Sequence, residues 1–261
     1  MSSTANPAGG RSRRDRILTI YGRQPVAEAL DDRAIPVSRV FVAERAVGPI
    51  IERIGAAART RGIELQILPD TRIALLAGNA RHHQGVAADI APPGLDALEA
   101  YLEGRRGRRH NTSLLLTDGV HNPSNLGMII RSATAAGLDG VVIPHQGTAE
   151  LGPLVIKASA GVALRATLLR SEDSRQALEA LRRARFEVVA LDGSQPDAPS
   201  LFDAELQPRA VYVLGNESTG LSPGTAPLVD RYLSIPLAGG VESLNVACAA
   251  TMVGFEVFRR A

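Results

Sequence analysis

The sequence has no tryptophan, a single cysteine and a single lysine, and aromatic residues make up 3% of it. One cysteine, Cys248, excludes a disulfide within the chain and is typical of a reducing compartment. Scarce aromatics mean that any nucleic-acid site would depend on arginine and backbone groups rather than on stacking. The apolar run from Ile17 to Ile20 is too short for a signal sequence or a membrane span. We therefore expect a cytoplasmic protein without a membrane segment.

The length of 261 residues exceeds that of most single domains and favours two. Breaks in composition occur after the arginine-rich start and at Pro92, Pro93 and Gly94. We expect a disordered basic tail over residues 1–16, a first domain over 17–91, a basic linker over 92–111 and a second domain over 112–261.

Positive charge is concentrated in two short segments. Residues 1–16 carry a net charge of +3 and the four arginines between Arg105 and Arg109 add +4, whereas the whole chain carries +2, which leaves −5 elsewhere. Clustered arginines bind phosphate backbones through bidentate contacts and counterion release. The alternative is a solvated tail and a solubilising linker.

The first domain alternates helical and extended patterns. Strands are expected over Ser38–Ala43, Glu64–Pro69 and residues 86–91, with helices from Pro25, across Ile50 to Ala58 and from Thr71. This alternation predicts a small α/β/α domain. His82 and His83 lack a cysteine or carboxylate at ligand spacing, so we favour a turn there over a metal or acid–base site and predict no metal.

Two glycine-containing loops follow apolar runs in the second domain: GNESTGLS, residues 215–222, and IPLAGGVESLNVA, residues 235–247. Glycine allows close backbone approach, and polar residues at the carboxyl ends of strands in α/β sheets commonly bind ligands. Glu217, Ser243 and Asn245 lie in or beside these loops. Two ordinary turns are the alternative.

A third stretch, residues 118–144, contains the sequence DGVHNPSNLGMIIR. Ser124 or Asn125 is expected to cap a helix that turns Ile129, Ala133 and Ala136 toward the core. Asn125 and Arg131 do not share one face of that helix. Arg131 either faces a site or forms an ion pair within the domain, because a buried charge without a partner is costly.

Three motifs in this order resemble those of the SpoU (TrmH-like) family of RNA 2′-O-ribose methyltransferases, within the SPOUT class. They are D-x-x-x-N-P-x-N-x-G-x-x-x-R from Asp118 to Arg131, G-N-E-x-x-G-L-S, and I-P-x-x-G-x-x-x-S-L-N-V. GRQPVAEAL and HQGVAA in the first domain look like that family's substrate-binding domain. The family often has Gly where Ser218 stands, which affects the expected contacts of that loop.

The resemblance implies an α/β fold: a C-terminal parallel-sheet SPOUT domain with a deep trefoil knot, preceded by a small α/β/α, L30e-like RNA-binding domain. S-adenosylmethionine would lie in the knot, and the closing helix, residues 246–258, would join two copies into a homodimer. The implied cofactor-binding residues are Leu214, Gly215, Asn216, Gly220, Ile235, Leu237 and Leu244. The implied catalytic residues are Arg131, Asn125, Glu217, Ser243 and Asn245. The candidate RNA contacts are Arg11, Arg13, Arg14, Arg23, Arg105, Arg106, Arg108 and Arg109.

In the family, the arginine that matches Arg131 is assigned the activation of the 2′-hydroxyl. A guanidinium hardly loses its proton, so we expect Arg131 to orient the hydroxyl and a phosphate and to stabilise developing negative charge. The other four catalytic candidates would position Arg131 and the ribose.

Rival methyltransferase classes fit the residues less well. A Rossmann-type methyltransferase would have a G-x-G turn after its first strand, and none follows LLLTDGV. An enzyme that methylates amino groups would have Asn-Pro-Pro with an aromatic residue, whereas Asn122-Pro123 leads here to Ser124. An enzyme that methylates C5 of a pyrimidine needs a thiolate nucleophile. Cys248 lies in an apolar helical run and is expected to be a small core residue.

The expected function is 2′-O-methylation of a nucleotide in structured RNA, with 23S rRNA as the substrate. A tRNA methylase and an antibiotic-resistance rRNA methylase remain open within this class. A non-catalytic RNA-binding or ribosome-assembly protein is the alternative of another class, but such a protein would be expected to have lost at least one of the five catalytic candidates.

Overall fold

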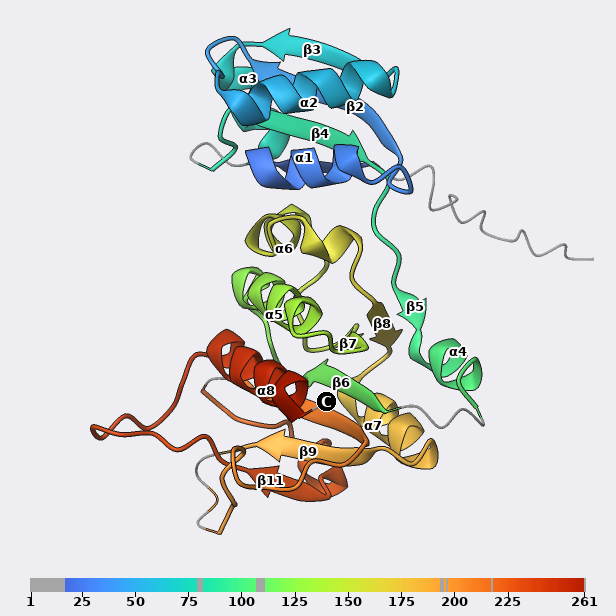
Figure 1. The fold of residues 1–261 in the computed structure, drawn as a ribbon, viewed down its shortest axis with the longest axis vertical. Coiled ribbons are helices and arrows are strands. Elements are labelled where there is room, and N and C mark those ends of the chain that lie inside the picture. Colours follow the sequence, from blue (N-terminus) through green and yellow to red (C-terminus); the bar gives the residue numbers. More distant parts are fainter. Residues whose placement is uncertain are drawn as a thin grey trace, which may run out of the picture. The chain divides into compact units, whose positions relative to one another are not determined.

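The computed structural model describes residues 17–78, 82–106, 111–192, 195, 197–216 and 218–260. The chain divides into two compact units, residues 1–93 and 94–261 (Figure 1). The predicted basic tail lies outside the described residues, as do Arg108, Arg109 and Glu217. Among the described helices, none combines the length and the apolar character that crossing a membrane requires.

The first unit is a four-stranded sheet with the strand order β1-β4-β2-β3. β4 pairs antiparallel with both β1 and β2, while β2 and β3 are parallel. Helices α1 and α2 pack against each other, and α3 contacts β1, β2 and β4. The elements are β1 (Leu18–Tyr21), α1 (Arg23–Asp31), β2 (Val37–Ala43), α2 (Pro49–Thr60), β3 (Glu64–Leu68), α3 (Asp70–Ala77) and β4 (Val86–Ile90).

Local sequence explains these elements. In α2, Pro49 lies in the first turn and the buried residues Ile54 and Ala58 are one helical turn apart. β4 is buried along its whole length, as a central strand covered on both faces should be. Its Asp89 accepts hydrogen bonds from Thr19 at 2.7 Å and from Arg39 at 2.9 Å, so the one buried charge of the strand is paired.

The second unit is a seven-stranded sheet with the order β11-β9-β10-β6-β7-β8-β5, and every pairing in it is parallel. The expected α/β class with a parallel C-terminal sheet is confirmed, while the trefoil knot stays a prediction. The strands are β5 (Asp96–Ala97), β6 (Thr112–Thr117), β7 (Gly140–Pro144), β8 (Leu168–Ser171), β9 (Glu187–Leu191), β10 (Arg209–Leu214) and β11 (Arg231–Leu233). The helices are α4 (Leu98–Glu103), α5 (Pro123–Ala135), α6 (Pro153–Ala158), α7 (Ser174–Arg183) and α8 (Val246–Arg260), with short 3₁₀ turns at Val162–Leu164 and Ala226–Leu228.

Helices cover both faces of this sheet (Figure 1). Leu114 and Leu116 of β6 pack in one core cluster with residues of α4 and α7. Leu115, between them, points to the opposite face because side chains alternate along a strand. That face belongs to α5 and α8, which pack against each other and contact β7 and β10 respectively.

Residues 94–106, within the stretch expected as a linker, belong to the second unit. β5 pairs with β8, and Leu98 and Tyr101 of α4 are 0% and 9% exposed in the same core cluster as α7. The helix of this segment begins at Leu98. The segment was expected to be a linker because prolines and arginines dominate its composition. It packs in the second unit because Leu98 and Tyr101 enter the core.

Candidate functional site

Two loops meet at the carboxyl ends of the neighbouring strands β6 and β10. β6 and β10 pair in register, with Thr117 opposite Leu214. The backbone N–H of Asp118 donates to the carbonyl of Leu214 at 2.8 Å. The loop after β6 therefore starts beside the GNESTGLS loop after β10. This is the edge at which open α/β sheets bind ligands.

The loop of residues 215–222 closes on itself. Asn216 and Gly220 exchange two backbone hydrogen bonds of 2.9 Å. A Cβ atom at Gly215 would lie 2.7 Å from the carbonyl carbon of Gly220, so only glycine fits there. The side chain of Asn216 accepts from the N–H groups of Ser218 and Thr219 at 2.9 and 3.1 Å and donates to the carbonyl of Gly119 at 2.9 Å. The loop is thus fixed to the first motif.

Asp118 makes a second connection between the motifs. Its side chain is buried, and its two oxygens accept from the Ser174 hydroxyl and from the Ser222 N–H, each at 2.7 Å. Hydrogen bonds to a buried carboxylate are among the stronger ones in proteins. Asp118 opens the first motif, but no local signal links it to Ser174 or Ser222, which are 56 and 104 residues away.

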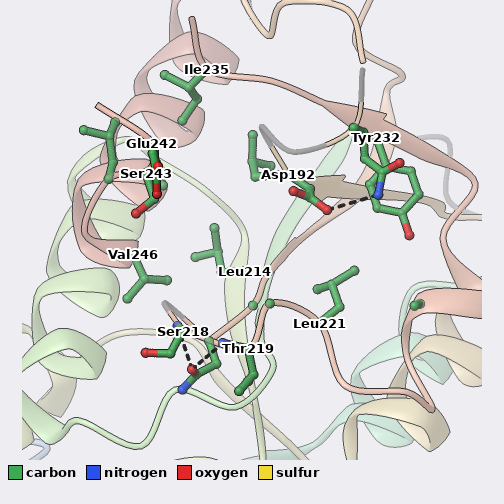
Figure 2. Close-up of a pocket in the computed structure, with 18 of the residues that line it drawn as sticks. Asp192, Leu214, Ser218, Thr219, Leu221, Tyr232, Ile235, Glu242, Ser243 and Val246 are labelled. Carbon is green, nitrogen blue, oxygen red and sulfur yellow. Dashed lines mark hydrogen bonds between the residues drawn. The ribbon is translucent and has the colours of Figure 1, made fainter. Parts of the chain in front are cut away.

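A pocket with a volume of about 560 Å³ lies between this loop, the end of β9 and the segment that leads into α8. Figure 2 shows Leu214 between the loop of Ser218 and Thr219 and the segment of Ile235, with Asp192 and Tyr232 on one side and Glu242 and Ser243 on the other. All seven expected cofactor residues line it: Leu214, Gly215, Asn216, Gly220, Ile235, Leu237 and Leu244. Leu191, Asp192, Tyr232, Glu242 and Val246 also line it and were not predicted.

Two of the catalytic candidates contact each other. The side-chain amide of Asn245 donates to the side-chain oxygen of Asn125 at 3.2 Å, and Asn245 accepts from the N–H of Ala247 at 2.9 Å. Asn125 is 6% exposed. Ser243, two residues before Asn245, lines the pocket. The third motif therefore reaches both the pocket and the first motif.

The expected cap of α5 was wrong by two or three positions. Asn122, rather than Ser124 or Asn125, is the N-cap, and its side chain accepts from the N–H groups of both later residues at 2.8 and 3.4 Å. Pro123 explains the difference, because proline is favoured in the first turn and places the cap just before it. Asn125 consequently lies inside the first turn of α5.

Arg131 is exposed on α5 and does not line the pocket. Within the described part of the chain its side chain forms no ion pair or hydrogen bond, so the intradomain ion pair considered from the sequence is not found. The structure does not bring Arg131 next to Asn125, which lies nearly two helical turns before it. Its guanidinium is open to a ligand or a partner.

The described RNA-contact candidates differ in setting. The N–H and Nε of Arg23 donate to the side chain and the carbonyl of Gln84 at 2.9 and 3.2 Å. The guanidinium of Arg105 lies 3.8 Å from the centre of the Tyr101 ring. Arg106 is exposed. Arg11, Arg13, Arg14, Arg108 and Arg109 lie outside the described residues.

The two histidines of the first unit lie in a turn. The Nδ1 atom of His83 accepts from the N–H of Gly85 at 3.1 Å, and this side chain is buried. No three His, Cys, Asp or Glu side chains in the described ranges gather as a metal site would require.

Cys248 was expected in the core, and this was wrong: it is exposed. The outward side of α8 also carries Phe255 and Phe258, which are 46% and 62% exposed. Positions 248, 255 and 258 recur at helical spacing, so Cys248 belongs to that outer face. The sequence did not distinguish the outward face of α8 from the inward one, because both carry apolar residues.

Comparisons with known proteins cover nearly the whole chain. A sequence model of the SpoU rRNA methylase family matches residues 112–255, and a model of the RNA 2′-O ribose methyltransferase substrate-binding domain matches residues 19–96. A Staphylococcus aureus protein assigned to the TrmH family of tRNA/rRNA methyltransferases is 32% identical over 241 residues, which span 92% of this chain and 95% of the relative.

Solved structures agree in fold. The SpoU methyltransferase AviRb from Streptomyces viridochromogenes is 25% identical with a TM-score of 0.73, over 94% of this chain and 89% of that one. A TrmH family protein from Porphyromonas gingivalis is 26% identical with a TM-score of 0.70, over 95% and 92% of the two chains. With both family models matched in order and a relative similar along almost its full length, the chain belongs to the SpoU rRNA methylase family of RNA methyltransferases.

Proposed function

We propose that the protein transfers a methyl group from S-adenosylmethionine to a ribose 2′-hydroxyl in structured RNA, with 23S rRNA as its substrate in the cytoplasm. One observation carries the proposal: the third motif lines the pocket through Ser243 and contacts Asn125 of the first motif through Asn245. A cofactor in the pocket would then lie beside residues able to position a ribose.

The pocket suits S-adenosylmethionine in size and chemistry. Its volume falls in the usual range for small-molecule sites. Leu214, Ile235 and Leu244 offer apolar surface for an adenine, while the backbone of the glycine loop offers polar groups. AviRb has also been solved with AdoMet. When bound, this cofactor supplies a methyl group on a positively charged sulfur.

The protein's own residues would place the nucleophile and compensate its charge. The 2′-oxygen bonds to the methyl carbon, the sulfur keeps the electrons of the broken bond, and the hydroxyl proton is released to solvent. Arg131 holds a phosphate and stabilises the negative charge that develops on the 2′-oxygen. Asn125, Asn245, Ser243 and Glu217 hold the ribose in line with the methyl group, which provides the larger share of the acceleration.

We propose ribosomal RNA because the family model that matches the second unit is described as an rRNA methylase family. In addition, the model of a separate substrate-binding domain matches the first unit. A structure that concerns methylation of C/U34 on tRNA matches 61% of this chain, so the likeness to that enzyme leaves a large part of the protein unaccounted for. The relative from Staphylococcus aureus is named for tRNA and rRNA alike, so an experiment must include both pools.

We further propose that two copies pair through the second unit, which would carry the knot. Cys248, Phe255 and Phe258 give α8 an exposed apolar face, and Met128 of the adjoining α5 is 40% exposed. Contiguous exposed apolar side chains mark interaction surfaces. Light scattering of the wild type should give the mass of a dimer, and Phe255→Glu with Phe258→Glu should give a monomer. A monomeric wild type would contradict this part.

The deciding experiment is transfer of labelled methyl from S-adenosylmethionine to ribosomal RNA, intact ribosomal subunits and, separately, transfer RNA, all from cells that lack this protein. Nuclease digestion then identifies the product. A 2′-O-methylnucleoside in the 23S rRNA supports the proposal, and one in the tRNA pool corrects its substrate. If no pool accepts methyl while the protein binds RNA, the non-catalytic alternative replaces it.

A further inference from the structure

A second cavity, of about 580 Å³, lies beside the cofactor pocket. Four segments from the carboxyl edge of the sheet line it: the loop after β6, the turn after β7, the start of α7 and residues 219–224 after β10. Neither the three motifs nor the comparisons give this cavity a role.

The two cavities share a wall. Asn216, Thr219, Gly220 and Leu221 line both, and Figure 2 shows Thr219 and Leu221 from the side of the first pocket. The hydrogen bonds of Asp118 and Asn216 fix this wall to the loop after β6. A molecule bound in the second cavity would therefore lie one loop away from the cofactor.

Most of the lining side chains are polar or small, but the wall that they form is more apolar than polar in surface, and Leu221 and Pro223 are its large apolar members among the described residues. Gln146, His121 and Arg175 offer exposed side-chain donors and acceptors. A mostly apolar wall with a few polar groups favours a ligand that has both apolar surface and hydrogen-bonding groups, as the faces and the edge of a nucleobase do.

The charges argue against a phosphate as the group that enters. Asp118 and Asp173 both line the cavity, and Arg175 is neutralised by Glu179 at 2.9 Å. Gln146 donates to Glu172 at 3.0 Å, which adds a further carboxylate near the rim. A phosphate would be repelled here, whereas the uncharged edge of a nucleobase finds donors and acceptors together.

We propose that the second cavity binds the base of an unpaired RNA nucleotide that neighbours the methylated ribose, and so contributes to the choice of site. This inference rests on the proposed function, because the RNA must approach the shared loop to reach a methyl donor in the first pocket. Proteins read single-stranded RNA by taking bases out of the stack and bonding to their edges. Gln146 and Arg175 are the residues assigned to that recognition.

The test uses the full chain and a library of randomised single-stranded RNA octamers, selected for binding and sequenced. Gln146→Ala and Arg175→Ala remove groups from the cavity. Gln176→Ala and Arg183→Ala remove the same side chains from exposed positions of α7 outside both pockets, and serve as matched controls.

The wild type should enrich one base at one or more positions, and each cavity variant should lower that enrichment by about fivefold or more, as expected for a lost base contact. The controls should keep the wild-type preference. Equal enrichment in wild type and cavity variants, or no enrichment by the wild type, overturns the inference. S-adenosylmethionine binding and methyl transfer to bulk RNA are measured in parallel, so failure of the proposed function is seen separately.

Discussion

Asn245 and Asn125 are joined by a side-chain hydrogen bond of 3.2 Å although 120 residues separate them in sequence. The bond orients the buried amide of Asn125 at the start of α5. Removing its donor by Asn245→Ala should lower single-turnover methyl transfer by about 10- to 100-fold, because small errors in placement are costly to the rate.

Cofactor affinity, measured by calorimetry, should change little in Asn245→Ala. The double variant with Asn125→Ala should be no slower than the slower single variant, since both changes break one contact. Additive losses would show that the two residues act independently. Asn111→Ala, at an exposed position of the same unit, is the control.

Arg131→Ala should abolish methyl transfer and leave both cofactor binding and the melting temperature nearly unchanged, because the side chain is exposed and unpaired within the described residues. Arg131→Lys should retain part of the activity, since it keeps the charge but loses the bidentate geometry. Arg183→Ala is the matched control. Loss of cofactor binding in a well-folded Arg131→Ala protein would contradict the assigned role.

Gly127 of α5 lies directly against α6. A Cβ atom there would lie 2.5 Å from the carbonyl oxygen of Val155 and 2.6 Å from the Cβ of Ala158. Gly127→Ala should lower the free energy of unfolding by about 1–3 kcal/mol, as overpacking does. Gly55→Ala in α2, where the nearest atom is a flexible arginine end at 3.5 Å, should be neutral or stabilising. Chemical denaturation of both variants tests this, and equal effects would refute it.

Glu256 is 6% exposed and bonds to Arg259 and Arg260, and these arginines lower its pKa to about 2 from 4.5. A carboxyl with a lowered folded pKa stabilises the protein fully above its unfolded pKa and loses that contribution as the pH falls through the folded value. Glu256→Gln should therefore cost about 2 kcal/mol at pH 7. The difference from wild type, measured by urea unfolding, should begin to shrink below pH 4.5; a constant difference would count against the ion pairs.

The net charge of residues 1–16 is +3, so their removal should weaken RNA binding most at low salt. The slope of log affinity against log salt should become shallower by up to about 3 for double-stranded contacts. A full-length variant with Arg11, Arg13, Arg14 and Arg16 changed to glutamine should match the deletion. An unchanged slope would assign RNA binding to other parts of the protein.

The fold class and the set of pocket residues could be predicted from the sequence because they depend on order and local chemistry. The strand Arg209–Leu214 is apolar after its first residue, and the glycine loop of residues 215–222 follows it directly. The seven predicted residues surround one pocket because the two loops follow strands on the same half of the sheet. Their proposed contacts with the cofactor stay a prediction.

Other features depend on packing between distant segments, which periodicity does not report. Between Val246 and Phe255, α8 has one hydroxyl residue, Thr251, and no charged one, so its sequence does not tell the outward Cys248 from the inward Ala250. The cap of α5 was assigned to the wrong residue because several polar residues surround Pro123. The bonds of Asp118 to Ser174 and Ser222 join three loops that follow three different strands, and only the sheet order brings them together.

The bond between Asp118 and Ser222 spans 104 residues, and the one between Asn125 and Asn245 spans 120. During synthesis, the ribosome adds Asp118 and Asn125 long before it adds their partners Ser222 and Asn245. The first unit can fold while the second is still being translated, but the binding edge is completed only when the last segments have left the exit tunnel. A nascent chain would thus hold its matched substrate-binding domain well before this edge was complete, and a truncation before Asn245 would leave the first unit whole while removing the bond to Asn125.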